Sequence, residues 1–412
     1  MRTLMLTASI LALAGCGFSG TDEQEERAQP ADAASTQPTD NLADAMASAD
    51  YGARDTDVPA IPDPEQRPIM QAQVTLDRLG FGPGVIDGAM GMSTRNALSG
   101  FQEANNLQVT GELDEATRQL LGRGRQYEAT RVVRIPEDWG QQQYRPLPDD
   151  PAQQAELERL GYTSLEERLA ERFHTTVEVL RSLNPNGRPA GMTSPAGGNS
   201  GAAMRAQASP SPTPTATGTG GASPAPTASA APSMFRPGQI VRVPNIGGDR
   251  IVPGAIEDEQ WRRTLASLGV GSSQPEVARI VVSKSEDTLK AYDADNRLIA
   301  LFTVSSGSQD DPLPLGSWEI LGEAYNPTYS YDPELLRGAP DSDAKQQLPS
   351  GPNSPVGVVW IDLSKEHYGI HGTPEPQTIG RAQSNGCVRL TNWDAARLAQ
   401  MVDGSTEVEF IA

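Results

Sequence analysis

Two kinds of hydrophobic periodicity divide the chain into helical and β-rich parts. Between Pro68 and Leu121, apolar residues recur at helical spacing between glycine-bearing turns, which predicts three short helices. Ser93 is predicted to cap the second of these helices and Asp114 the third. From Arg279 onward, the apolar residues fall instead in short β-prone runs separated by turns. The pattern therefore predicts a small helical unit and, much later in the chain, a mostly β domain.

The predicted β domain has several short strands and one helix. The strand-like runs lie at residues 280–282, 289–292, 298–305, 318–320 and 356–363. Thr391 and Asn392 can cap a helix that begins at Trp393. Because helical signal is scarce elsewhere in this part, residues 278–411 are predicted to form one mostly β domain.

Residues 154–245 carry a weaker pattern of two helices and a closing strand. Ser164-Leu165-Glu166-Glu167 and Thr175-Thr176-Val177-Glu178 are capping boxes, and each opens a helix. The run from Phe235 to Pro244 then turns into a strand, although no first strand is evident. Residues 190–233 are mostly small residues and proline, which predicts a flexible insertion. Taken together, these features resemble a degenerate LysM-like module; the alternative is a helical linker that presents the next domain.

The N-terminus carries an apolar segment typical of an export signal. Arg2 precedes a short apolar run that ends in Leu13-Ala14-Gly15-Cys16, which resembles a bacterial lipobox. The resemblance implies that residues 1–15 are removed and that Cys16 is lipidated, whereas the alternative is an ordinary signal peptide. Residues 16–65 show no sustained apolar period and are predicted to be a disordered tether. No apolar run reaches the roughly 18 residues of a spanning helix.

Charge and composition narrow the location and the partners. The 53 acidic and 33 basic side chains give a net charge of −20, which argues against a nucleic-acid partner because phosphate binding needs a basic face. An export signal predicts the periplasm. Gly17 stands where Asp commonly signals retention at the inner membrane, so an anchored protein is weakly expected at the outer membrane. No cluster with metal-ligand spacing is visible, so neither a metal nor another cofactor is expected.

The two cysteines have different meanings if Cys16 carries lipid. Cys387 is then a lone thiol in an oxidising compartment, which favours catalysis, with a small buried hydrophobe as the alternative. A neighbouring imidazole makes a thiol nucleophilic near neutral pH, and His371 ends a strand-like segment. Gly386 could leave amide groups free for an oxyanion, and Arg389 could hold a carboxylate.

The chain contains two further histidines. His174 falls between the two helices of the middle unit and is predicted to be a solvated surface residue. His367 lies four residues before His371 and is predicted to be structural or at the rim of a site.

Two stretches resemble families of cell-wall proteins. The run LGFGPGVIDGAMGMSTRNAL, followed by FQ and NNLQVTGELDEAT, is similar to the three-helix peptidoglycan-binding domain over residues 66–123. Asp87 and Phe101 in this run are expected to be structural. The motifs HGT at 371–373 and SNGCVRL at 384–390, preceded by GPNSPVG, resemble the catalytic domain of the YkuD-type L,D-transpeptidases over residues 278–411.

The second resemblance implies a role for each residue of the motifs. Cys387 would be the nucleophile, His371 its general base, and the Gly372 carbonyl the group that orients the imidazole. Amide groups at Gly386 and Cys387 would stabilise the oxyanion, beside the fixed charge of Arg389. Asn385 stands where the family often has a second histidine. Contacts with substrate are expected, less firmly, from Ser384, Asn385, Tyr325 and Trp360.

The combined expectation is a multidomain, lipid-anchored enzyme of peptidoglycan. It would transfer an acyl group in two steps from a tetrapeptide stem to a second stem and form a 3→3 cross-link. If water resolves the acyl-enzyme, the protein is instead a carboxypeptidase or endopeptidase of the same fold; a free D-amino acid or a protein lysine is another possible acceptor. A non-catalytic wall anchor is the alternative outside enzymes. Loss of the helical domain is expected to lower activity on intact sacculi more than on soluble muropeptides.

Overall fold

The computed structural model describes residues 58–123, 127–192, 233–247, 249–308, 310–335, 340, 343–382, 384 and 386–412. The chain divides into two units, residues 1–49 and 50–412, and every described residue belongs to the second. The predicted signal peptide, Cys16 and most of the insertion at 190–233 lie outside the described residues. Of the helices in the described ranges, none is long and apolar enough to cross a membrane.

The first folded part contains the three predicted helices, α2 (Pro68–Arg78), α3 (Met92–Ala104) and α4 (Glu115–Leu121). Asp114 caps α4 as predicted, because its carboxylate accepts a hydrogen bond from the Thr117 amide at 2.8 Å. The prediction for Ser93 is wrong: α3 begins at Met92, so Ser93 lies inside the helix. Gly91 is the N-cap residue, and it provides no side-chain cap. Asp87 is structural as expected, since it accepts from Gln73 Nε2 at 3.0 Å and orders the turn.

The described middle part has three α-helices between two strands. The elements are β1 (Thr130–Arg134), the 3-10 turn η1 (Glu137–Gln141), α5 (Pro151–Ala155), α6 (Leu165–Arg172), α7 (Val177–Leu183), the turn η2 (Pro185–Gly187) and β2 (Ile240–Pro244). Ser164 caps α6 as predicted, whereas the cap of α7 is Thr176, one residue after the predicted Thr175. The strand that the sequence pattern did not reveal is β1, which pairs antiparallel with β2 and lies before residue 154.

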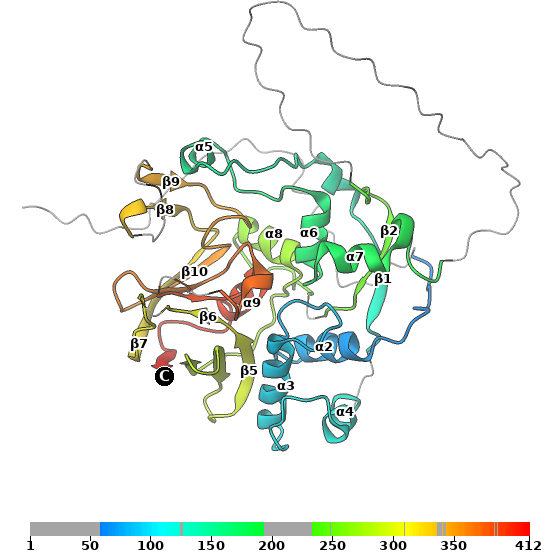
Figure 1. Ribbon diagram of the computed structural model, residues 1–412, viewed down its shortest axis with the longest axis horizontal. Coiled ribbons are helices and arrows are strands. Elements are labelled where there is room, and N and C mark those ends of the chain that lie inside the picture. Colours follow the sequence, from blue (N-terminus) through cyan, green and yellow to red (C-terminus); the bar gives the residue numbers. More distant parts are fainter. Residues whose placement is uncertain are drawn as a thin grey trace, which may run out of the picture. The chain divides into compact units, whose positions relative to one another are not determined.

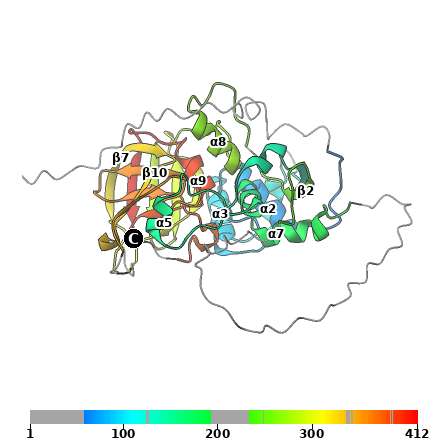
Figure 2. The same ribbon diagram turned by 90° about the horizontal axis from the view of Figure 1, so that it is seen from above.

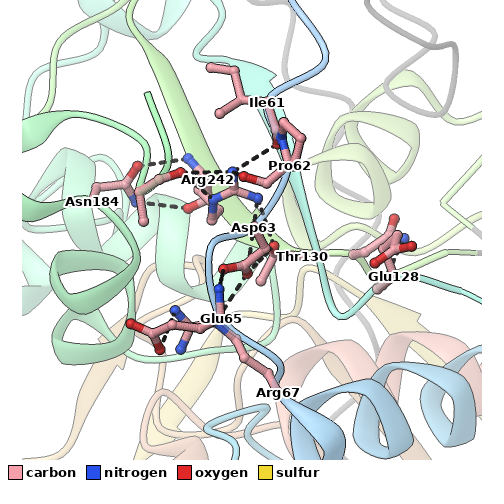
Figure 3. Close-up of polar contacts among 11 residues, drawn as sticks. Ile61, Pro62, Asp63, Glu65, Arg67, Glu128, Thr130, Asn184 and Arg242 are labelled. Atoms are coloured by element: carbon pink, nitrogen blue, oxygen red, sulfur yellow. Dashed lines mark hydrogen bonds and ion pairs between the residues drawn. The ribbon is translucent and has the colours of Figure 1, made fainter. Parts of the chain in front are cut away.

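Arg242 on β2 fixes the start of the described chain to this middle part (Figure 3). Its buried guanidinium donates to the carbonyl oxygens of Ile61 and Pro62 at 2.8 and 2.9 Å and to Thr130 Oγ1 at 2.9 Å. Asn184 exchanges two hydrogen bonds with the backbone of Arg242, each of 2.7 Å. Residues 61–62 are therefore held in place, although their composition predicts a tether.

The C-terminal part is built on a mixed sheet, which comprises nine of the described strands. These are β3 (Arg279–Ser283), β4 (Thr288–Tyr292), β5 (Leu298–Thr303), β6 (Ser305–Ser306), β7 (Gly316–Tyr325), β10 (Val359–Leu363), β11 (Gly369–His371), β12 (Val388–Arg389) and β13 (Glu407–Ile411). Their order is β5-β4-β3-β13-β7-β10-β11-β12-β6, with parallel pairs at β3–β13 and β11–β12. The mostly β character predicted from the sequence is confirmed.

Two 3-10 turns, two α-helices and a separate two-stranded sheet complete the described C-terminal part. β8 (Tyr329–Tyr331) pairs with β9 (Gln346–Leu348), and the 3-10 turns are η3 (Pro333–Leu335) and η4 (Pro376–Thr378). The helix α9 (Asn392–Leu398) is capped by Thr391 as predicted. A further helix, α8 (Glu259–Leu268), precedes residue 278 but places Trp261, Leu265 and Leu268 in the same hydrophobic core as the sheet. The folded core of the β domain thus begins earlier than its strand pattern.

The helical N-terminal part packs against β5, the edge strand of the sheet (Figures 1 and 2). The amide of Gly82 donates to the Leu301 carbonyl at 2.7 Å, and Phe81 forms an isolated β-bridge with Leu301. Gly100 on α3 leaves no space for a Cβ beside the Leu301 side chain. Because this contact protects an otherwise open edge, removal of the helical part would change the stability of the sheet.

His174 joins all three parts, and its predicted position at the surface is wrong. Its ring is fully buried and stacks on Trp393 of α9, with ring centroids 4.8 Å apart. Nδ1 lies 3.2 Å from Asp77 Oδ1 on α2, and Nε2 lies 2.8 Å from the Leu268 carbonyl on α8. Arg397 of α9 also contacts Asp77, at 3.3 Å. The local sequence predicts a short polar turn at His174. The ring is buried only because the N-terminal and C-terminal parts pack over this turn.

Candidate active site

Three neighbouring strands bring the predicted catalytic residues to one face of the sheet. His371 on β11 is paired with Trp360 on β10 and with Arg389 on β12. Paired residues in neighbouring strands point to the same face, and side chains along a strand alternate between faces. Cys387 directly precedes β12, and the charge of Arg389 acts on its thiol. The strand register therefore gathers His371, Trp360 and Arg389 on one face, with Cys387 next to this group.

His371 is held as a neutral imidazole with a defined tautomer. Its side chain is buried, and Nδ1 donates a hydrogen bond of 2.7 Å to the carbonyl oxygen of Gly372. The Trp360 indole, on the neighbouring strand β10, stacks on the imidazole with ring centroids 5.4 Å apart. Burial lowers the pKa of His371 to about 4, and the charge of Arg389 acts in the same direction, while the bond to Gly372 opposes it. Near neutral pH, Nε2 therefore carries a lone pair.

Cys387 is a partly buried thiol at the start of β12. Burial raises its pKa, while the Gly369 backbone and the charge of Arg389 act in the opposite direction. Its Sγ lies 3.7 Å from the carbonyl oxygen of His367, whose own ring is exposed at the rim as expected. The resting pair is thus a thiol and a neutral imidazole, so a base must remove the proton as the thiol attacks.

The loop before Cys387 is held by hydrogen bonds from the neighbouring strand. Ser384 Oγ donates to the Cys387 carbonyl at 2.5 Å and accepts from the Gly307 amide at 2.7 Å. Lys284 Nζ in turn donates to the Gly307 carbonyl at 2.9 Å and to that of Ser306. The Cys387 backbone is therefore held by the Ser384 side chain. The Gly307 residue that binds Ser384 is in turn held by the Lys284 side chain, from a distant part of the sequence.

Gly386 occupies a position that only glycine fits easily. Its φ is +100°, and a Cβ there would lie 2.6 Å from Cε1 of Tyr368. Tyr368 directly precedes β11, so the phenol ring packs over the backbone next to Cys387. The close approach of the Tyr368 ring explains why residue 386 is glycine. The backbone next to the Cys387 thiol therefore carries no side chain at this position.

Comparison with known proteins identifies the domain that contains this face. A family model described as "L,D-transpeptidase catalytic domain" matches residues 277–410, and one described as "Putative peptidoglycan binding domain" matches residues 65–121. A Bacillus subtilis protein named "Putative L,D-transpeptidase YkuD" is 51% identical over 129 residues, 31% of this chain and 63% of that protein. The protein of that name in Bacillus licheniformis is 34% identical over 130 residues, 32% of this chain and again 63% of the relative.

A third relative is covered over more of its length. It is a protein of Fuscovulum blasticum, named for the ATP synthase subunits region and as an L,D-transpeptidase, with 30% identity over 151 residues, 37% of this chain and 75% of its own length. The chain belongs to the L,D-transpeptidase family. It spans 63% of the length of each of the two Bacillus relatives named YkuD.

Within the domain that matches the family, one predicted substrate contact lies elsewhere. Tyr325 is paired with Val359 on the face opposite to His371, where its ring stacks on Trp261 with centroids 4.5 Å apart and its hydroxyl lies 3.4 Å from the Ala399 carbonyl. Ser384 lies beside Cys387 but is buried and holds backbone groups. Side chains alternate between the two faces along β7, and this alternation is the feature that directs Tyr325 away from the face of His371.

Some of the other predicted residues lie outside the part of the chain that the structure describes. Asn385 and Cys16 lie outside the described residues. Tyr329 on β8 belongs to the segment 325–329, which the family resemblance placed over the cleft; burial raises its pKa and the charge of Cys387 raises it further, which marks a phenol near the thiol. In the described ranges, no group of three or more His, Cys, Asp or Glu side chains is arranged to hold a metal ion.

Proposed function

We propose that this chain is a peptidoglycan L,D-transpeptidase in which Cys387 is the nucleophile and His371 the general base. The observation that carries the proposal is the arrangement of His371: Nδ1 donates to the Gly372 carbonyl at 2.7 Å, and His371 is in register with Arg389, whose charge acts on the Cys387 thiol. Among the contacts of the described residues, no hydrogen bond occupies Nε2. This nitrogen is therefore available to accept the thiol proton.

The first half-reaction makes a thioester. Sγ of Cys387 attacks the carbonyl of the third residue of a tetrapeptide stem as Nε2 takes the proton. Amide groups at Gly386 and Cys387 bind the oxyanion, and the terminal D-Ala leaves with the proton from His371. Arg389, in register with His371, supplies the positive charge for a substrate carboxylate.

The second half-reaction sets the product. The side-chain amine of a second stem attacks the thioester, His371 accepts its proton, and a 3→3 cross-link forms as the thiol is restored. The family membership and the peptidoglycan-binding match at 65–121 support peptidoglycan as both donor and acceptor. We further propose that a lipid on Cys16 anchors the mature protein in the periplasm, at the outer membrane.

The test uses the full chain with Cys16→Ser, which removes the second thiol, and a disaccharide-tetrapeptide as substrate. Mass spectrometry should detect a dimer that lacks one D-Ala, and the same chain with Cys387→Ala should give none. Tripeptide monomer alone would replace the proposal with an L,D-carboxypeptidase. No reaction in either sample would overturn catalysis in favour of a wall anchor. Metabolic labelling with palmitate, abolished by Cys16→Ser, tests the anchor.

A further inference from the structure

Asn392, the first residue of α9, has a fixed amide that the proposed chemistry does not yet use. Its side chain is fully buried, and Nδ2 donates to Glu171 Oε1 at 2.7 Å and to the Pro352 carbonyl at 2.9 Å. The Pro352 carbonyl can only accept, so the amide has a single orientation with Oδ1 on the opposite side. The two bonds hold this oxygen in one place.

The oxygen of Asn392 lies against the turn that orients His371. A Cβ added to Gly372 or to Gly357 would overlap Asn392 Oδ1, so the two glycine backbones pack directly on it. Gly372 is the residue whose carbonyl accepts the bond from His371 Nδ1. The position of the Asn392 amide therefore limits how far this peptide can tilt, and with it the direction of the imidazole.

Glu171, which holds the amide, belongs to α6 and not to the β domain. Asn392 and Tyr162 both hydrogen-bond its carboxylate, and burial raises its pKa to about 7. Together with Pro352 and Gln377, Glu171 lines a cavity of about 350 Å³ between α6, α7 and the loop after His371. The middle part of the chain thus reaches the catalytic loop through one buried hydrogen bond.

We propose that Glu171 and Asn392 are positioning residues for the catalytic base, so that α6 of the middle part sets the orientation of His371. The inference rests on the proposed function, because His371 needs a fixed orientation only if it moves protons. A general base must be held within a fraction of an ångström of its productive position. The middle part then contributes to the chemical step in addition to any role in wall binding.

The kinetic test compares three variants in the full Cys16→Ser chain with the disaccharide-tetrapeptide. Glu171→Ala removes the acceptor of the Asn392 bond and should lower kcat about ten- to hundredfold with KM little changed, because orientation and not binding is lost. Glu171→Gln keeps an acceptor oxygen and should restore most of kcat. Glu178→Ala is the matched control, since this exposed carboxylate lines the same cavity without touching Asn392, and it should leave kcat unchanged.

A spectroscopic test separates orientation from general loss of structure. The chain has three histidines, so ¹⁵N-histidine labelling gives a spectrum in which His371 can be assigned with His371→Gln. His371 should appear as one Nδ1–H tautomer in the parent chain and in Glu171→Gln, and as a mixture of tautomers in Glu171→Ala. If Glu171→Ala loses its melting transition, Glu171→Asp replaces it, because the shorter side chain withdraws the acceptor and should act in the same direction.

The two proposals fail in different ways. An unchanged kcat, or a lower kcat with the His371 tautomer intact, would overturn the positioning roles while leaving the transpeptidase proposal standing. An inactive parent chain whose His371 tautomer still depends on Glu171 would overturn the proposed function and leave the structural link intact.

Discussion

The molecule buries two histidines and uses them in opposite ways. His174 has a partner at each ring nitrogen, Asp77 and the Leu268 carbonyl, and its ring is covered by Trp393. Among the described residues, His371 has a hydrogen-bond partner at Nδ1 alone, the Gly372 carbonyl. A ring with both nitrogens engaged fixes the packing of its neighbours, whereas a ring with one nitrogen unengaged can transfer protons. Burial therefore does not mark a catalytic histidine; the hydrogen-bond partners do.

The surroundings of the two rings differ in charge as well. Beside His174, burial of Asp77 opposes its ionisation, but the charges of Arg397 and His174 prevail and lower its pKa to about 2. Beside His371, by contrast, burial and the positive charge of Arg389 both disfavour the imidazolium. One site is thus a compensated ion cluster, and the other keeps its histidine neutral.

The largest expected difference comes from the same substitution at each histidine. His371→Gln should lower the rate of thioester formation by about 10²- to 10⁴-fold, the contribution of a general base, with little change in stability. His174→Gln should lower the free energy of unfolding by about 1–3 kcal/mol, because buried polar partners lose a bond, and leave the rate nearly unchanged well below the melting temperature. Single-turnover acylation and urea unfolding measure the two effects. Equal rate losses would end the distinction.

A smaller effect is expected from the ion cluster beside His174. Asp77→Asn removes one of the two buried carboxylates that contact Arg397, the other being Asp394 at 3.7 Å, and should cost about 3 kcal/mol of stability by urea unfolding. The matched control is Glu103→Gln, which breaks the exposed ion pair with Lys290 between the same two parts of the chain and should cost at most about 1 kcal/mol.

The contribution of Asp77 to the free energy of unfolding should decrease as the pH falls. Its pKa in the folded protein, about 2, lies below the ordinary value of 3.8, so its contribution to stability is complete above pH 4 and is lost as the pH falls toward 2. The Asp77→Asn chain should lack this loss. Similar acid unfolding of both chains, or equal costs for Asp77→Asn and Glu103→Gln, would contradict the role of the cluster.

The smallest effect concerns the resting state of Cys387. Because burial raises the pKa of the thiol and the pKa of His371 is about 4, alkylation by iodoacetamide should be slower than for free cysteine at pH 7. The rate should still rise with pH through the ordinary range of a thiol. The measurement uses the Cys16→Ser chain, with Cys387→Ala as the blank. A plateau reached below pH 7 would instead indicate a preformed thiolate–imidazolium pair.

Much of the site could be predicted because the motifs are local. His371, Gly372, Gly386, Cys387 and Arg389 lie in two short runs, and glycine at 386 is required by a backbone with φ of +100°. Positions that depend on strand pairing were harder to foresee. Tyr325 differs from the site residues by the face to which the alternation of β7 directs it, and the register of β7 is set by β10 and β13.

The sequence by itself determined the local elements and the chemical groups. Helix caps such as Asp114, Ser164 and Thr391 act on amide groups within three residues, so their effect is readable from the chain. Only the tertiary structure decided that His174 is buried, that β1 pairs with β2 across more than a hundred residues, and that Glu171 reaches Asn392. These contacts join segments with no shared local pattern. They form because each part leaves polar and apolar groups that only the surface of another part can satisfy.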